Sequence, residues 1–252
     1  MKKNSVMNWC KECVLPDTRP NLVIGSDGVC NACKQHKLKK SIDWKQRENS
    51  LKRVIENAKK RSTGYDCVIP VSGGKDSWVQ ALTLSKELGL KTLCVTLANH
   101  LPTTEGIANL NNMIKDLNVD HMKINLKPSF YRSVRRKCTI EQGEPNWAEH
   151  CAVFSSVVNI AVIYDVPLIV WGEDIAFEFG GGQRQESTAS AMEIDRSDLN
   201  KEGKVIEDWL DEDLSERDTF FYKYPDYEIL KQANIQSIYL GHYTNWLSLI
   251  HI

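Results

Sequence analysis

The fold of this chain is decided by one stretch of its sequence, Ser72-Gly73-Gly74-Lys75-Asp76-Ser77. The apolar run at 66–71 before it suits a buried parallel strand, and the apolar residues from Trp78 to Leu88 recur at helical spacing. A strand followed by a glycine turn and the first turn of a helix favours the binding of an anion. The glycines let backbone N–H groups approach the anion, and the N-terminus of the helix adds partial positive charge. The stretch therefore predicts a phosphate-binding loop.

The side chains of this loop suit a phosphate group accompanied by a metal ion. Lys75 supplies a point charge, and the hydroxyls of Ser72 and Ser77 can donate to phosphate oxygens. Asp76 cannot bind phosphate directly, so we expect it to hold Mg²⁺ or to cap the helix. The GxxxxGK[ST] spacing of a Walker A loop is absent. The alternative is a glycine turn that caps a helix without binding a ligand.

Strand-like and helix-like segments alternate along the rest of the chain. The expected elements are strands at 91–97, 119–124 and 166–171 and helices at 103–117 and 145–164. Pro145 is expected at the first position of its helix. The alternation predicts an α/β fold with a doubly wound, mostly parallel sheet that binds ligands at the carboxyl ends of its strands. The loops expected to converge there are 72–77, the stretch after Leu97 and 172–174.

Four of the eight cysteines form two CxxC pairs separated by sixteen residues: Cys10, Cys13, Cys30 and Cys33. This spacing fits a zinc ribbon in which four thiolates surround one Zn²⁺ ion. Four cysteine ligands leave no open coordination position, so we expect a structural ion. Reduced cysteines without metal and an iron–sulfur cluster are the alternatives.

The composition is that of a soluble protein with a core, since 42% of the 252 residues are hydrophobic and 26% are charged. No segment reaches the ~20 apolar residues of a membrane span, and no secretory signal follows Met1. We therefore expect a cytoplasmic protein without a membrane partner, whose cysteines stay reduced. The net charge of −1 disfavours nucleic acid as a partner.

The charges are unevenly distributed. Residues 1–60 contain 14 Lys/Arg against 6 Asp/Glu, and residues 186–218 contain 4 against 12. The basic face is either solvated or docks a partner. The acidic segment has only Trp209 and Leu210 as a large apolar pair, which leaves open whether it folds or acts as a mobile lid.

The loop resembles the SGGxDS motif of the ATP pyrophosphatase (PP-loop) superfamily, whose members release pyrophosphate and leave AMP on the substrate. The resemblance implies ATP and Mg²⁺ as cofactors, with Lys75 and Asp76 as catalytic candidates. It also implies that Thr96 and Leu97 lie at the adenosine. Gly172, in the third expected loop, completes the cofactor-binding candidates.

Two further motifs are similar to the N-acetyl sugar amidotransferase family. The first is Cys10-x-x-Cys13-Val14-Leu15-Pro16-Asp17-Thr18-Arg19-Pro20 with Gly28-Val29-Cys30-Asn31-Ala32-Cys33. The second is Trp171-Gly172-Glu173-Asp174-Ile175-Ala176-Phe177-Glu178-Phe179-Gly180-Gly181. The resemblance covers roughly Cys10 to Trp246. It implies adenylation of the acetamido group of a nucleotide-linked sugar and displacement of AMP by ammonia, giving an acetamidino sugar for surface polysaccharides such as O-antigen lipopolysaccharide.

Glu173 is the catalytic candidate on the substrate side of the site, with Asp174 and Glu178 nearby. These carboxylates can hold Mg²⁺, bind sugar hydroxyls or accept a proton from ammonia, and loop capping is their structural alternative. No glutaminase signature is present. The family therefore implies ammonia from a separate glutaminase and channel protein pair.

Two other functions stay open at this point. One is tRNA sulfur transfer, which shares the loop and needs reactive cysteines; besides the CxxC pairs the chain has Cys67, Cys94, Cys138 and Cys151. A meeting of Cys138 with Cys151 would favour it. The other is a zinc-ribbon scaffold that senses nucleotide without turnover.

The expected organisation is a zinc ribbon at 1–40, a linker helix at 41–64, a PP-loop domain at 65–246 and a tail at 247–252. The linker helix is expected from Trp44 to Arg61. The tail resembles no family sequence, whereas the family continues into a further helical region. We therefore expect the natural protein to be longer, with part of the sugar site beyond this chain.

Overall fold

The computed structural model describes residues 7–18, 22–98, 100–173, 204–212 and 214–246. Their centre is a five-stranded sheet in the order β3-β2-β1-β4-β5, and every pair of neighbours is parallel. The strands are β1 Cys67–Pro70, β2 Thr92–Leu97, β3 Asp120–Ile124, β4 Leu168–Trp171 and β5 Gln236–Tyr239. The chain winds outward from β1 in both directions. The expected doubly wound α/β sheet is thereby confirmed.

The longer helices are α1 Asn31–Leu38, α2 Trp44–Arg61, α3 Lys75–Leu82, α4 Thr104–Leu117, α5 Pro128–Gln142 and α6 Trp147–Ile163. Two shorter helices, α8 Tyr227–Ala233 and α9 Leu240–Tyr243, flank β5. Single turns are η1 Lys39–Ser41, η2 Thr83–Glu87, η3 Ile206–Trp209, η4 Glu216–Asp218 and η5 Phe220–Tyr222. Among the described helices none is long and apolar enough to cross a membrane.

Two hydrophobic cores lie on opposite faces of the sheet, because successive strand residues point to opposite sides. Val68 of β1 belongs to the core formed with α5 and α6. Ile69, the next residue, belongs to the core formed with α2, α3 and α4. The sheet is therefore the middle of three layers, which fixes the carboxyl ends of its strands as one edge.

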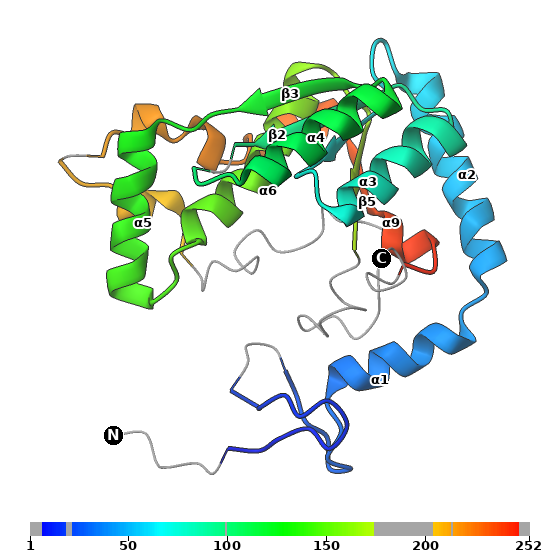
Figure 1. Ribbon diagram of the computed structural model, residues 1–252, viewed down its shortest axis with the longest axis horizontal. Helices are drawn as coiled ribbons and strands as arrows, with labels where there is room; N and C mark the ends of the chain where they lie inside the picture. Colours follow the sequence, from blue (N-terminus) through cyan, green and yellow to red (C-terminus); the bar gives the residue numbers. More distant parts are fainter. Residues whose placement is uncertain (1–6, 19–21, 99, 174–203, 213, 247–252) are drawn as a thin grey trace.

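The N-terminal cysteine module has its own small cluster of buried residues, made of Cys10, Leu22 and Cys30. Figure 1 shows this module in dark blue, joined through α1 and α2 to the sheet. The linker helix α2 has the expected bounds, and it buries Leu51, Ile55 and Ala58 against the sheet domain. The expected division into domains stays a prediction.

One expected helix boundary was wrong, and some elements of the fold were not expected. The helix expected from Pro145 begins at Trp147, because Gly143 (φ +73°) ends α5 and the Glu144 carboxylate accepts the Asn146 N–H at 2.7 Å, which forms a link of its own. The proline at a first helical position is instead Pro128 of α5. Helix α5 was not expected, nor was the strand β5 with the short helix α8 before it.

The acidic segment is only partly described. Residues 186–203 lie outside the described residues, as does the tail 247–252. In the described part, Trp209 is 1% exposed and its ring meets that of Trp147 edge-on at 5.4 Å. Lys137 pairs with Asp211. Residues 204–212 and 214–218 are therefore packed onto the domain.

Candidate active site and metal centre

The glycine loop follows β1 at the carboxyl edge of the sheet, between β2 on one side and β4 on the other. This is the point where the strand order reverses. At such a point the loops of neighbouring strands diverge to opposite faces, which leaves room for a ligand between them. The loop is thus placed where a parallel sheet binds its ligand.

Gly73 adopts a left-handed backbone conformation with φ +82°. A Cβ atom at this position would lie 2.8 Å from the amide nitrogen of Leu110 in α4. Glycine is therefore required twice, for the turn and for the contact with α4. Gly74 has φ −71° and is the N-cap residue of α3, and a Cβ there would meet only the Ser72 hydroxyl oxygen, at 3.4 Å.

The side chains of Ser72 and Ser77 form hydrogen bonds within the turn. The N–H of Ser72 donates to the Ser77 hydroxyl at 2.9 Å, and the two hydroxyl oxygens lie 3.2 Å apart. The N–H of Gly74 points to the Ser72 hydroxyl at 3.4 Å. Both hydroxyl groups accept from backbone N–H groups, and one of them donates to the other, so one hydroxyl proton remains for a ligand oxygen in this arrangement.

Lys75 and Asp76 form the charged part of the loop. The Lys75 ammonium lies 3.1 Å from both carboxylate oxygens of Asp76, and the side chains are 38% and 36% exposed. Both stand in the first turn of α3, whose N-cap Gly74 offers no side-chain cap. A partly exposed ion pair at a helix start can rearrange to meet phosphate through Lys75 and a cation through Asp76.

The end of β2 supplies the candidates for the adenosine. Thr96 is 7% exposed, and its hydroxyl donates to the Val71 carbonyl at 2.7 Å. The Nε2 atom of His121 on β3 lies 2.9 Å from the same hydroxyl. Leu97 is partly buried against the core on the α5 and α6 face. The side chain of Thr96 is thus engaged within the protein, and sequence reasoning missed His121.

The end of β4 is tied to its neighbours around Gly172. The Gly172 carbonyl accepts the Gly241 N–H at 2.9 Å, and a Cβ on Gly172 would lie 3.5 Å from the Trp246 ring. Gln80 of α3 donates to the Val170 carbonyl at 2.7 Å, which joins α3 to β4. Glu173 follows and is half-buried. Asp174 and Glu178 lie outside the described residues.

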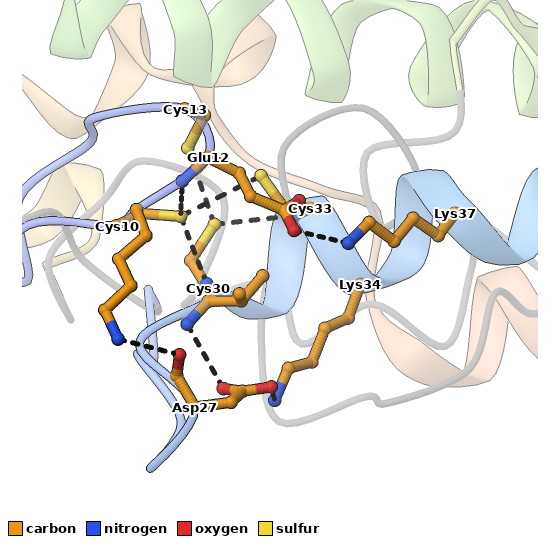
Figure 2. A network of polar contacts seen from close by, with 10 residues as sticks. Cys10, Glu12, Cys13, Asp27, Cys30, Cys33, Lys34 and Lys37 are labelled. Atoms are coloured by element: carbon orange, nitrogen blue, oxygen red, sulfur yellow. Dashed lines mark hydrogen bonds and ion pairs between the residues drawn. The ribbon is translucent and has the colours of Figure 1, made fainter.

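The four sulfurs of the CxxC pairs converge, as Figure 2 shows. All lie within 4.8 Å of one another, with Cys10 to Cys33 at 3.9 Å and Cys13 to Cys30 at 3.6 Å. A tetrahedral ion with Zn–S bonds of about 2.3 Å needs sulfurs about 3.8 Å apart. The donor set therefore fits a four-coordinate thiophilic ion such as Zn²⁺.

The electrostatics of the cluster also fit a cation. Backbone N–H groups of Cys13, Cys30 and Glu12 lower the pKa of the Cys10 thiol to about 6. Burial raises the pKa of Cys30 and of Cys33, so four thiolates need a positive ion among them. Around the cluster, Lys34 pairs with Asp27 at 3.0 Å, and Lys37 pairs with Glu12 (Figure 2).

The other cysteines are buried in the sheet domain. Burial raises the pKa of Cys67, Cys94 and Cys138 to about 12 each. Cys138 lies on α5 and Cys151 on α6, and the Cys151 thiol donates to the Tyr222 carbonyl at 3.1 Å. These thiols suit packing rather than nucleophilic chemistry.

Fold and site together define an α/β protein with a glycine loop at the switch point of a parallel sheet and an N-terminal cluster of four cysteines whose geometry fits a metal ion. No family model matches the chain. Over 118 residues, 46% of its length, it is 30% identical to an uncharacterised protein of Methanocaldococcus jannaschii, of which it covers 42%. Over 113 residues, 44% of its length, it is 27% identical to a glutamine-hydrolyzing GMP synthase of Pyrobaculum aerophilum, of which it covers 22%. The chain thus spans less than half of these curated relatives.

Several solved structures are similar to this one. An NH3-dependent NAD synthetase from Campylobacter jejuni has a TM-score of 0.44 and 16% identity, over 56% of this chain and 62% of that one. An NMN synthetase from Francisella tularensis has a TM-score of 0.42 and 17% identity, over 77% and 92%. A U34-tRNA thiolase from Methanococcus maripaludis has a TM-score of 0.37 and 12% identity, over 69% and 56%. The fold assignment rests on the chain's own sheet order and loop.

Proposed function

We propose that this chain is an ATP-dependent amidotransferase of the PP-loop class, which adenylates the N-acetyl group of a nucleotide-linked sugar and exchanges its oxygen for ammonia. The observation that carries the proposal is the glycine loop at the end of β1, with Gly73 at φ +82° and α3 starting directly behind it. This arrangement presents backbone N–H groups and a helix N-terminus to an anion. A triphosphate is the anion that the SGGxDS motif implies.

The first chemical step would transfer AMP to the substrate. The amide oxygen of the acetamido group attacks the α-phosphorus of ATP, the bond to the β-phosphate oxygen breaks, and pyrophosphate leaves. The loss of the amide proton gives an O-adenylated imidate. In this step the hydroxyls of Ser72 and Ser77 hold phosphate oxygens and Lys75 neutralises the pyrophosphate. Asp76 would hold Mg²⁺, which supplies further positive charge at the phosphates.

The second step would exchange oxygen for nitrogen. Ammonia adds to the imidate carbon, a proton leaves the nitrogen, and the C–O bond breaks to release AMP. The product is an acetamidino sugar. Glu173, half-buried at the end of β4, is our candidate acceptor for the ammonia proton. Holding the amide oxygen in line with the α-phosphorus is the main task of the protein, because an amide oxygen is a weak nucleophile.

The choice of an acetamido sugar rests on the N-terminal and 171–181 motifs. The name of the Pyrobaculum relative joins the synthesis of a nucleotide with glutamine hydrolysis, which agrees with amide nitrogen as the second substrate. A role in surface-polysaccharide synthesis and a cytoplasmic location belong to the same proposal. Zn²⁺ at Cys10, Cys13, Cys30 and Cys33 would be structural.

Ammonia would come from a separate glutaminase with its channel protein. A glutaminase needs a nucleophile that is ionised and accessible. Within the described ranges, the thiols outside the cysteine cluster are buried, and those of Cys67, Cys94 and Cys138 have raised pKa values. The same burial weighs against sulfur transfer by these cysteines. A nucleotide-sensing scaffold differs from the proposal in showing no turnover.

The test is product analysis of the purified chain with ATP, Mg²⁺ and ammonium against a panel of nucleotide-linked acetamido sugars. We expect AMP to appear only with the right sugar, in equal amount to a sugar whose mass has changed by the exchange of O for NH. Glutamine in place of ammonium should give no AMP. ADP as the product, or AMP formation that depends on tRNA and a sulfur donor, would overturn the proposal.

A further inference from the structure

Three residues on three neighbouring segments form a hydrogen-bonded chain that ends at the glycine loop. His121 lies on β3, Thr96 on β2, and Val71 directly follows β1. The His121 Nε2 atom is 2.9 Å from the Thr96 hydroxyl, and that hydroxyl is 2.7 Å from the Val71 carbonyl oxygen. The chain therefore runs across the sheet from its edge strand to the residue before Ser72.

The direction of each bond follows from the groups involved. A carbonyl oxygen can only accept, so Thr96 donates its single hydroxyl proton to Val71. The Thr96 oxygen must then accept from His121, and Nε2 must carry a proton. The neutral ring is thereby held in the Nε2–H tautomer. For a neutral ring, the Nδ1–H tautomer does not satisfy both distances.

The chain acts on one peptide unit, the one that joins Val71 to Ser72. Its carbonyl accepts from Thr96 at 2.7 Å, and its N–H donates to the Ser77 hydroxyl at 2.9 Å. Because a peptide unit is planar, bonds on both of its sides set its orientation. The next residue, Gly73, carries the left-handed turn at φ +82°. The path of the loop therefore starts from a plane that Thr96 and Ser77 hold.

His121 sits in a setting that suits a neutral donor. Its ring is half-buried, and this desolvation, with Lys123 on the same strand, lowers its pKa. On β2, Cys94 is the register partner of His121, and Thr96 lies two residues further along the same face. The ring thus reaches forward toward the carboxyl edge of the sheet, where the loop begins.

We infer that His121 is a positioning residue for the glycine loop, acting through the Thr96 hydroxyl on the Val71–Ser72 peptide unit. It orients Thr96, and Thr96 sets the plane from which the loop N–H groups face a phosphate. The Thr96 side chain then serves the loop rather than the adenosine. The identity of the ligand, ATP, rests on the proposed function. The geometry of the positioning contact is that of the free protein.

The test compares variants that remove each bond with variants that restore it. Thr96→Val removes the donor to Val71 and Thr96→Ser keeps it. His121→Leu removes the donor to Thr96, and His121→Gln offers an amide N–H at about the same reach. The matched control is Thr92→Val on the same strand, where a 4% exposed threonine donates to the Leu90 carbonyl at 3.2 Å, away from the loop.

Two measurements give independent readings. In the free protein, ¹⁵N spectra of the histidines should show His121 protonated at Nε2, and the amide signals of Ser72 to Gly74 should move in Thr96→Val and His121→Leu only. In ATP titration, Thr96→Val should weaken binding about tenfold and His121→Leu about threefold. The serine and glutamine variants and Thr92→Val should stay within about twofold of the parent.

An Nδ1–H tautomer, or loop amide signals that do not move in Thr96→Val and His121→Leu, would overturn the inference. So would ATP affinities that fall as much in Thr92→Val as in Thr96→Val, since the loss would then be one of general stability. If the parent chain binds no ATP, the proposed function fails. The spectra of the free protein still decide the positioning role in that case.

Discussion

The backbone of Leu110 in α4 occupies the space that a side chain on Gly73 would need. A Cβ on Gly73 would lie 2.8 Å from the Leu110 nitrogen and 2.9 Å from its Cα, and the turn at Gly73 has φ +82°. The contact joins the loop after β1 to the helix after β2. It explains why the loop depends on a helix some 35 residues further along the chain.

Replacing Gly73 should therefore damage the fold as well as the site. We expect Gly73→Ala to lower the free energy of unfolding by about 2–5 kcal/mol, from the left-handed backbone and the clash with α4. Gly64→Ala is the control, because a Cβ there meets nothing within 4 Å. Urea unfolding measures both. Equal stability of the two variants would contradict the contact.

Metal binding should depend on the four clustered cysteines alone. We expect the purified chain to hold about one Zn²⁺, and Cys13→Ser to lose it, since a three-thiolate site binds less tightly. Cys94→Ala, a change in the sheet core, should keep the metal. Elemental analysis measures the zinc content of each variant. A chelator should lower the melting temperature of the parent protein but not that of Cys13→Ser. Iron and sulfide in place of zinc would contradict the structural zinc assignment.

The buried thiols should be unreactive toward alkylating reagents. Burial raises the pKa of Cys67, Cys94 and Cys138 to about 12, so at pH 8 these residues are neutral thiols rather than thiolates. We expect no alkylation of them within hours in the folded protein, and full alkylation in urea, as mass spectrometry would show. Rapid labelling of Cys138 in the folded chain would revive sulfur transfer.

Tyr222 should tolerate the loss of its hydroxyl. The residue is 3% exposed, and within the described part of the chain its hydroxyl has no hydrogen-bond partner. Tyr222→Phe should leave the free energy of unfolding unchanged or raise it by about 1 kcal/mol. Tyr131→Phe is the comparison, because its hydroxyl donates to Glu149 at 3.3 Å and its loss should cost about 0.5–1 kcal/mol. A large loss in Tyr222→Phe would reveal a bonded hydroxyl.

The elements predicted from the sequence are those with strong local signals. The helix Trp44–Arg61 has an apolar stripe, and at its start the Asp43 side chain accepts a hydrogen bond from the Gln46 N–H. This helix has its expected bounds. The glycine loop is recognisable because strand, turn and helix follow one another directly. The predicted start of α6 at Pro145 was wrong, because a proline before a helix and a proline at the first position of a helix look alike in sequence.

Helix α5 was not predicted although Pro128 at its first position is a local signal, whereas strand β5 and the contacts of His121 and Thr96 depend on distant partners. β5 is four residues long, and within the described ranges it pairs only with β4, more than sixty residues earlier in the chain. His121 reads as an ordinary strand residue until the register places Cys94 beside it and Thr96 within reach. The direction of the Thr96 hydroxyl likewise depends on Val71. No local pattern encodes such contacts, because they arise from pairing across the sheet.

Calorimetric titration with ATP and Mg²⁺ decides whether the loop after β1 binds ATP. Gly74 has φ −71°, and among the described residues a Cβ there would meet the Ser72 hydroxyl oxygen at 3.4 Å, so Gly74→Ala should keep the fold while placing a methyl group where phosphate approaches. We predict that the parent and Gly64→Ala bind ATP with the same affinity and that Gly74→Ala binds at least about tenfold more weakly. Equal affinity in Gly74→Ala, or no binding by the parent, would contradict the account.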